Sequence, residues 1–223
     1  MLSAHVVLFD LDGTLSDSAP GILASLRHAF DVKGIPRLDA VTERSLLGPP
    51  FYQSLPPLIG SAELADVIAA YRDYYGREGM YDTTVFAGVR QVLVGLRATG
   101  VRLAVATSKP EHYAMPIVEY LGLSEFFVTV AGDELDGSLG TKALVIGRAL
   151  ARLGVADPST VLMVGDRMHD VEGARELGIE TIGVGWGYAT PGELERAAPS
   201  CIVATPFELA RVLGVNGLDA EAS

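Results

Sequence analysis

The chain has 223 residues, 49% of them hydrophobic and 20% charged, so it can bury a sizeable core and is not composed like a disordered protein. Its 28 acidic and 17 basic residues give a net charge of −11, which disfavours nucleic-acid polymers and anionic membranes as partners. The single cysteine, Cys201, cannot form an internal disulfide, so we expect a reducing, cytoplasmic location. No apolar stretch approaches the roughly 20 residues needed to cross a bilayer.

Short runs rich in β-branched residues alternate with helical patterns along most of the chain. The apolar residues Val89, Val92, Leu93 and Leu96, for example, recur at helical spacing before Gly100. This alternation predicts an α/β fold with a parallel sheet between helices. The predicted strands span 5–9, 102–106, 127–131, 160–165, 180–184 and 201–204.

One long segment interrupts the alternation, because it holds several helical patterns and no strand-like run. Within it, Gly48-Pro49-Pro50 would end or turn a helix. We therefore expect a small helical cap inserted into the core and joined to it by two hinges. The expected core domain comprises residues 1–15 and 87–223, and the expected cap domain comprises residues 16–86.

Two pairs of aspartates follow predicted strands. Asp10 and Asp12 come directly after 5–9, and Asp166 and Asp170 follow 160–165. Carboxylates gathered at one point repel one another unless a cation or a proton lies between them, and Mg2+ prefers a few carboxylates plus water. Taken alone, the first pair fits a solvated Asp-Gly turn about equally well, and Asp170 fits an acid favoured by a helix dipole.

Two other segments carry groups that suit an anion. Thr107 and Ser108 follow the strand at 102–106, and a hydroxyl with backbone amides at a helix start can hold phosphate, although an ordinary helix cap also explains this pair. Lys142 begins an apolar helical pattern, where its charge opposes the helix dipole and requires an acidic or phosphate partner. Because parallel strands end at one edge of a sheet, all these groups would converge in a phosphoryl-transfer site.

The motifs resemble those of haloacid dehalogenase superfamily phosphatases, which implies a Rossmann-like, doubly wound parallel sheet with a helical cap. FDLDGT at 9–14 is similar to the family's DxDGT nucleophile motif, and GDRMHD at 165–170 to its GDxxxD metal motif. Thr107 and Lys142 match its strand-end hydroxyl and its lysine, but Ala143 stands where many relatives carry proline. The segments GPP (48–50), ATSKPE (106–111), DGS (136–138) and GVGWGY (183–188) look most like the phosphoglycolate phosphatase-like branch and its members described as 5′-nucleotidases.

The resemblance implies a Mg2+-dependent, phosphoglycolate phosphatase-like enzyme that hydrolyses a small phosphorylated metabolite as a monomer or homodimer. Asp10 would attack phosphorus and form an aspartyl-phosphate, while Asp12 would act first as acid and then as base. The remaining assignments follow the motifs: Asp10, Asp12, Asp166 and Asp170 for Mg2+, Thr107 and Lys142 for catalysis, and Gly13, Thr14, Ser108 and Lys109 for substrate binding. Arg44, in the expected cap, is a further candidate for substrate binding, although it fits a solvated helix face equally well.

Several alternatives use the same motifs. A 5′-nucleotidase and a β-phosphoglucomutase-like phosphoryl transferase would differ from a phosphoglycolate phosphatase mainly in the cap. Dehalogenation is disfavoured by Asp12, and a non-catalytic binding protein by the presence of all the motif acids. Tyr71 and Tyr75 share a helical face, which is more typical of a core than of a base-stacking surface. His169 is expected to face solvent.

Overall fold

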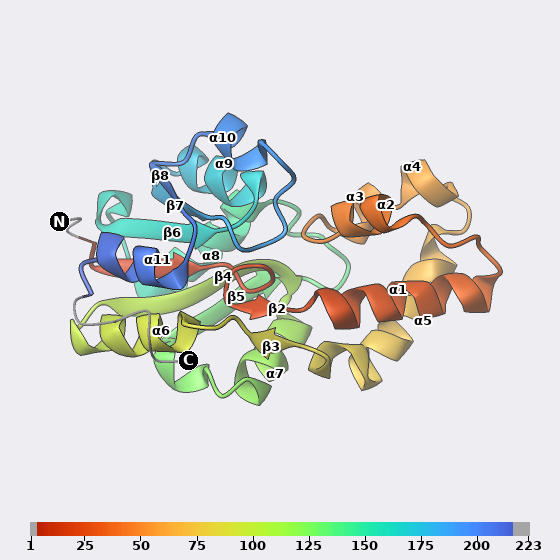
Figure 1. The fold of residues 1–223 in the computed structure, drawn as a ribbon, viewed down its shortest axis with the longest axis horizontal. Coiled ribbons are helices and arrows are strands. Elements are labelled where there is room, and N and C mark those ends of the chain that lie inside the picture. Colours follow the sequence, from red (N-terminus) through yellow and green to blue (C-terminus); the bar gives the residue numbers. More distant parts are fainter. Residues whose placement is uncertain (1–3, 216–223) are drawn as a thin grey trace.

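A six-stranded parallel sheet lies at the centre of the protein, in a computed structural model that describes residues 4–215 (Figure 1). Its strand order is β5-β4-β1-β6-β7-β8. All the strands predicted from the sequence are present, which confirms the α/β fold. Their bounds are β1 (Val6–Phe9), β4 (Arg102–Pro110), β5 (Thr129–Asp133), β6 (Val161–Gly165), β7 (Glu180–Val184) and β8 (Cys201–Val203).

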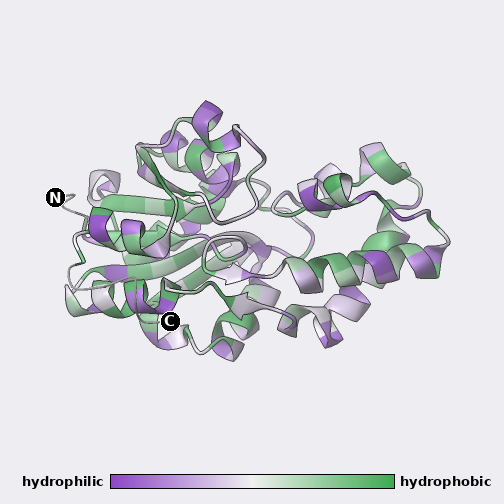
Figure 2. Ribbon diagram, in the orientation of Figure 1, coloured by the Kyte–Doolittle hydropathy of each residue, from purple (hydrophilic) through white to green (hydrophobic). Residues whose placement is uncertain are grey.

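The sheet is buried on both faces because successive side chains of a strand point in opposite directions. Val7 and Phe9 of β1 belong to the core cluster beneath one layer of helices, whereas Val6 and Leu8 belong to the cluster beneath the other. Figure 2 shows the hydrophobic colour along these strands. The first layer contains α6 (Val89–Ala98), α7 (Glu111–Tyr120) and α11 (Pro206–Val212), and the second contains α8 (Lys142–Leu153) and α9 (Met168–Glu176), against which α10 (Glu193–Ala197) packs.

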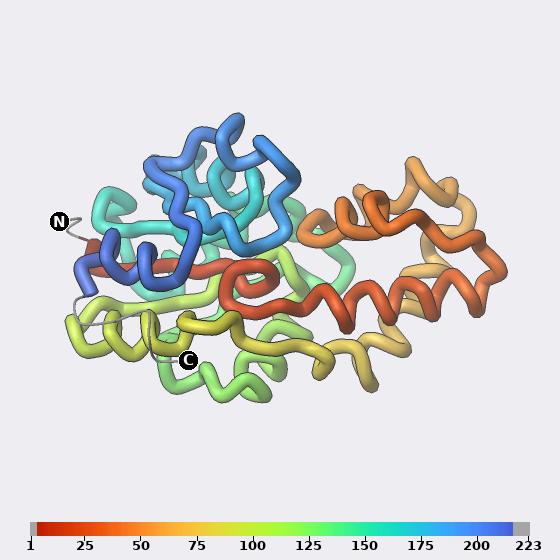
Figure 3. Tube along the Cα trace, in the orientation of Figure 1, coloured from red at the N-terminus to blue at the C-terminus, as the bar shows by residue number. Residues whose placement is uncertain are grey.

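The helices between β2 and β3 extend away from the sheet to one side (Figure 3). They form a small core of their own, in which Leu26 and Phe30 pack with Leu55 and Val67. No helix within residues 4–215 is long and apolar enough to cross a membrane. The helices are α1 (Ala19–Lys33), α2 (Ala40–Ser45), α3 (Phe51–Ser54), α4 (Pro56–Ile59) and α5 (Leu64–Arg77), followed by the 3-10 helix η1 (Gly79–Tyr81).

The inserted segment begins and ends in a second, two-stranded sheet. Strand β2 (Ser16–Asp17) pairs antiparallel with β3 (Thr84–Val85). The expectation that 16–86 contains no strand was therefore wrong at both ends, because two-residue strands leave no periodic pattern in a sequence. The pairing places the entry and the exit of the inserted segment side by side.

Candidate active site

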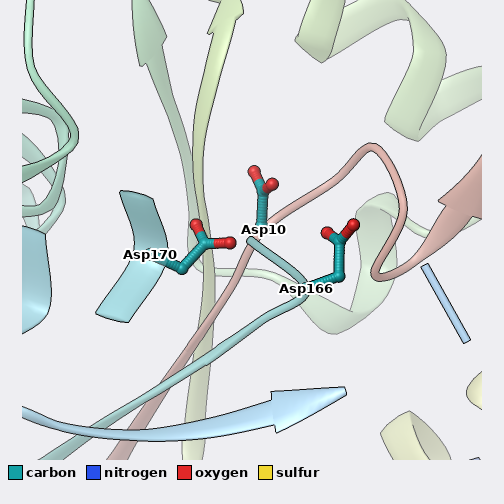
Figure 4. Close-up of side chains that lie close together, drawn as sticks. All are labelled: Asp10, Asp166 and Asp170. Carbon is teal, nitrogen blue, oxygen red and sulfur yellow. The ribbon is translucent and has the colours of Figure 1, made fainter. Parts of the chain in front are cut away.

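Three buried aspartates converge at the carboxyl edge of the large sheet (Figure 4). Asp10 follows β1, Asp166 follows β6, and Asp170 lies in the first turn of α9. Strands β1 and β6 are neighbours, so their ends bring Asp10 and Asp166 together. Each of the three side chains offers a carboxylate oxygen, and these oxygens lie within 4.8 Å of one another.

Lys142 supplies positive charge to this cluster from the start of α8. Its Nζ lies 2.8 Å from Asp10 Oδ1 and 2.6 Å from Asp170 Oδ1. Burial would lower the pKa of Lys142, but the charges of the two aspartates outweigh it and raise the pKa above its usual value. Burial raises the pKa of Asp170 to about 6, with Lys142 opposing that rise. Lys142 thus has the acidic partners that its place at a helix N-terminus requires.

Asp166 is held by Thr14, which was predicted to bind substrate, and by the backbone of Tyr188. Thr14 Oγ1 donates a hydrogen bond of 2.9 Å to Asp166 Oδ1, and the backbone N–H of Tyr188 donates one of 2.7 Å to Asp166 Oδ2. Gly13 has φ +81°, and a Cβ there would lie 2.3 Å from the same Oδ2. Gly13 and Thr14 therefore contact Asp166 and line neither of the cavities described below. Burial raises the pKa of Asp166 well above its usual value.

Asp12 forms a second ion pair at the mouth of the site. Its Oδ2 lies 2.7 Å from Lys109 Nζ, which also donates a hydrogen bond of 2.8 Å to the hydroxyl of Tyr75. Asp12 Oδ1 is buried and has no hydrogen-bond partner in the part of the chain that the structure describes. Lys109 therefore connects the motif loop that follows β1 to helix α5 of the inserted segment.

A pocket of about 320 Å³ opens onto Asp10 and contains most of the predicted site residues. His169 also lines it and is half-buried, so it is less exposed than expected, and burial lowers the pKa of this histidine. The other lining residues are Asp12, Gly48, Thr107, Ser108, Lys109, Lys142, Arg167 and Asp170.

Arg44, like Gly13 and Thr14, is a predicted substrate-binding residue that lies outside the linings of both cavities. Its side chain on α2 is exposed and lines neither this pocket nor the cavity beside it. The preceding residue, Glu43, is buried and its Oε1 accepts a hydrogen bond of 2.9 Å from Arg27 Nε. Because successive helical residues point about 100° apart, burying Glu43 turns Arg44 outward.

Sequence reasoning missed Arg167, which lies inside the GDRMHD motif. Its Nε is 2.7 Å from Glu193 Oε1, and its Nη1 donates to the backbone carbonyl of Leu47 in the inserted segment. The sequence offered one local indication of a role for Arg167, which is its position between Asp166 and Asp170. Leu47 and Glu193 are distant in sequence, so their contacts could not be predicted.

A larger cavity of about 780 Å³ adjoins the pocket between the inserted helices and the core. Tyr71 and Tyr75 of α5 stack at 5.2 Å between ring centroids, and Phe51 meets Tyr71 edge-on at 4.8 Å. Tyr75 is only 2% exposed, so it is the core residue that its helical face predicted, yet both tyrosines line the cavity. Asp12 and Lys109 form the border with the catalytic pocket.

The charge of the site fits a divalent cation. Four formal negative charges, on Asp10, Asp12, Asp166 and Asp170, face two positive charges, on Lys109 and Lys142, which leaves 2 − 4 = −2. Asp10 Oδ1 already contacts Lys142 Nζ, whereas the buried Oδ1 of Asp12 has no hydrogen-bond partner within residues 4–215. An all-oxygen donor set of this charge suits Mg2+.

Comparisons with known proteins agree with this site. The model of the haloacid dehalogenase-like hydrolase family matches residues 7–184. The chain is 41% identical over 215 residues to the tyrosine-protein kinase PtkA of Mycobacterium tuberculosis, covering 96% of this chain and 74% of that protein. It is 36% identical over 209 residues to a 5′-nucleotidase of Pseudomonas aeruginosa, covering 93% and 94%.

A solved structure described as a predicted phosphatase from Clostridium acetobutylicum superposes on this chain with a TM-score of 0.88 at 35% identity, covering 94% of this chain and 98% of that one. The chain belongs to the haloacid dehalogenase-like hydrolases. The expectation of an enzyme of this family with phosphatase chemistry is confirmed.

Proposed function

We propose that the protein is a Mg2+-dependent phosphomonoester hydrolase that forms an aspartyl-phosphate on Asp10. The contact of Lys142 with both Asp10 and Asp170, beside Asp166, carries this proposal. It joins a nucleophile, a cation and an acidic metal site in one buried cluster. In this proposal residues 1–15 and 87–223 form the catalytic core, and residues 16–86 form a cap that selects the substrate.

In the first step, a carboxylate oxygen of Asp10 attacks the phosphorus atom of the substrate. A P–O bond to Asp10 forms as the P–O bond to the leaving group breaks, and Asp12 gives its proton to the departing oxygen. Thr107, Ser108 and Lys142 line the pocket and are placed to hold the other phosphate oxygens. Lys142 also keeps the Asp10 carboxylate directed into the pocket.

In the second step, a water molecule attacks the phosphorus atom of the aspartyl-phosphate. Asp12, now a carboxylate, accepts the proton of the water, and the P–O bond to Asp10 breaks. Inorganic phosphate leaves, and both aspartates return to their starting states. The net reaction is the hydrolysis of one phosphomonoester to an alcohol and phosphate.

Asp10, Asp166 and Asp170, with the backbone carbonyl of Asp12, would hold Mg2+. When bound, the ion supplies positive charge that offsets the carboxylates and the substrate phosphate. The protein groups keep these ligands in place: Thr14 and Tyr188 fix Asp166, and Lys142 contacts Asp170.

The larger cavity favours a nucleoside monophosphate over phosphoglycolate as the substrate. Its aromatic wall of Phe51 and Tyr71 suits a flat ring, and stacking on an aromatic side chain contributes about 1–3 kcal/mol per base. A mutase of the β-phosphoglucomutase type would place a polar sugar against the same wall, which is a poorer match.

Phosphate release with and without Mg2+ tests the proposal, using nucleoside monophosphates, 2-phosphoglycolate, sugar phosphates and β-glucose 1-phosphate. We expect Mg2+-dependent release, fastest for a nucleoside monophosphate. Asp10→Asn should abolish turnover at an unchanged melting temperature, whereas Asp66→Asn, on an exposed carboxylate of α5, should leave both unchanged. Substantial activity in Asp10→Asn would overturn the mechanism.

The 41% identity to a protein named as a tyrosine kinase makes phosphoryl transfer from ATP a second candidate. The chain covers 74% of that relative, so part of it has no counterpart here. Incubation with labelled ATP and a tyrosine peptide distinguishes the two activities. A phosphomonoester hydrolase leaves the peptide unlabelled, whereas a kinase transfers the labelled γ-phosphoryl group of ATP to the tyrosine hydroxyl and releases ADP.

A further inference from the structure

Lys109 connects the acid–base residue of the core to the inserted helices. Its Nζ lies 2.7 Å from Asp12 Oδ2 and donates a hydrogen bond of 2.8 Å to the hydroxyl of Tyr75 on α5. The same nitrogen lies 4.9 Å from the centroid of the Tyr75 ring. The lysine side chain is 6% exposed. A buried ammonium group requires partners, and these two residues provide them.

The partner on α5 is held firmly. Tyr75 stacks on Tyr71 and meets Tyr113 edge-on at 5.3 Å between ring centroids, so its ring has little freedom. The register of β4 with β5 shifts between Ala106 and Pro110, and Lys109 lies in this irregular stretch. The backbone N–H of Lys109 also donates a hydrogen bond of 3.2 Å to Thr107 Oγ1 within this stretch of β4.

We propose that Lys109 is a positioning residue that holds the Asp12 carboxylate for proton transfer, and that Tyr75 holds Lys109. The inference rests on the proposed function, in which Asp12 protonates the leaving group. Lys109 contacts Oδ2 of Asp12, while Oδ1 has no hydrogen-bond partner among the described residues 4–215 and is left for the proton transfer. Because Tyr75 belongs to the inserted segment, the geometry of the acid depends on how those helices are seated on the core.

This role differs in a measurable way from direct binding of the substrate phosphate by Lys109. An alkoxide leaving group must be protonated as it departs, whereas p-nitrophenolate leaves without a proton. A phosphate ligand serves both substrates equally, but a residue that positions Asp12 matters only where the proton is needed. The ratio kcat/KM reports the steps up to the first irreversible one, so slow hydrolysis of the aspartyl-phosphate does not obscure this difference.

The experiment compares kcat/KM for the best alkyl phosphate of the substrate panel with that for p-nitrophenyl phosphate. Lys109→Met removes the charge, and Tyr75→Phe removes only the hydroxyl that holds Lys109. We expect Lys109→Met to lose at least about tenfold more with the alkyl phosphate than with p-nitrophenyl phosphate, and Tyr75→Phe to show a smaller loss of the same pattern. Tyr74→Phe is the matched control, because Tyr74 neighbours Tyr75 on α5 but stacks on His28.

Equal losses with both substrates would overturn the proposal and make Lys109 a phosphate ligand. Wild-type values in both Lys109→Met and Tyr75→Phe would also overturn it. If Lys109→Met fails to fold, the ratio of the two losses in Tyr75→Phe decides, because the Tyr75 hydroxyl accepts its hydrogen bond within residues 4–215 from Lys109 Nζ, whereas a change in substrate binding alone would affect both substrates. If the proposed hydrolase mechanism is itself wrong, Asp10→Asn will retain turnover. That result is distinct from a failure of the proposal for Lys109.

Discussion

Gly187 packs against the carboxylate of Asp166 so closely that a Cβ on Gly187 would lie 2.4 Å from Asp166 Oδ2. We expect Gly187→Ala to displace this carboxylate and weaken Mg2+ binding about tenfold or more. Gly147→Ala is the control, because nothing lies within 4 Å of its added Cβ in α8. That variant should bind Mg2+ normally and gain about 0.5–1 kcal/mol of stability. An unchanged Mg2+ titration in Gly187→Ala would remove Asp166 from the metal site.

The hydroxyl of Thr14 is expected to support Mg2+ binding by holding the Asp166 carboxylate in place. Thr14→Val keeps the shape of the side chain but leaves the buried Asp166 Oδ1 without its hydrogen bond of 2.9 Å. The loss of such an outer partner weakens metal affinity by about 10–100-fold. Thr14→Ser retains a hydroxyl and should restore most of the affinity. Isothermal titration calorimetry with Mg2+ measures the metal affinity of both variants, and equal affinities of Thr14→Val and Thr14→Ser would contradict the prediction.

Tyr188 supplies the N-terminal cap of α1 from a distant part of the chain. The backbone N–H groups of Ser18 and Ala19 donate hydrogen bonds of 2.7 and 2.9 Å to its hydroxyl oxygen, and the Ser18 side chain makes no capping bond. Tyr188→Phe should therefore lower the free energy of unfolding by about 1–2 kcal/mol in urea titrations. Tyr120→Phe, at an exposed position, is the control and should change it little. A stability equal to wild type in Tyr188→Phe would show that water replaces the hydroxyl.

The ionisation of Glu193 makes the free energy of unfolding depend on pH. Burial would raise the pKa of Glu193, but hydrogen bonds from Arg167 and from backbone amides outweigh burial and lower the pKa from 4.5 to about 2. A lowered folded-state pKa stabilises the protein above the unfolded value near 4.5, and this stability is lost as the pH falls towards 2. At pH 7 we expect Glu193→Gln to cost at most about 3 kcal/mol.

Urea titrations of wild type and Glu193→Gln across this range measure the effect. The difference in unfolding free energy should be constant above about pH 5 and narrow as the pH falls further. Glu195→Gln, at an exposed position on the same helix, should show almost no difference at any pH. A gap between Glu193→Gln and wild type that widens in acid would contradict the assignment.

Local patterns in the sequence predicted the strands and the motif residues at their ends, because burial on both faces and strand-end carboxylates leave short-range signals. The Lys109–Tyr75 and Arg167–Leu47 contacts could not be predicted in this way, since each joins segments far apart in the chain. Arg44 shows the opposite error. Its charge suggested a ligand contact, but the burial of Glu43 decided which way the helix faced.

The pairing of Ser16 with Val85 has a consequence for how enzymes of this shape can diversify. Both covalent connections of the inserted helices pass through the short β2–β3 pairing. We therefore expect that the segment between them can be replaced as a whole without moving the ends of β1 or β6. We expect a graft of the corresponding helices from a relative, joined at this pairing, to change which substrate is accepted. New specificities could then arise by recombination as well as by point substitution.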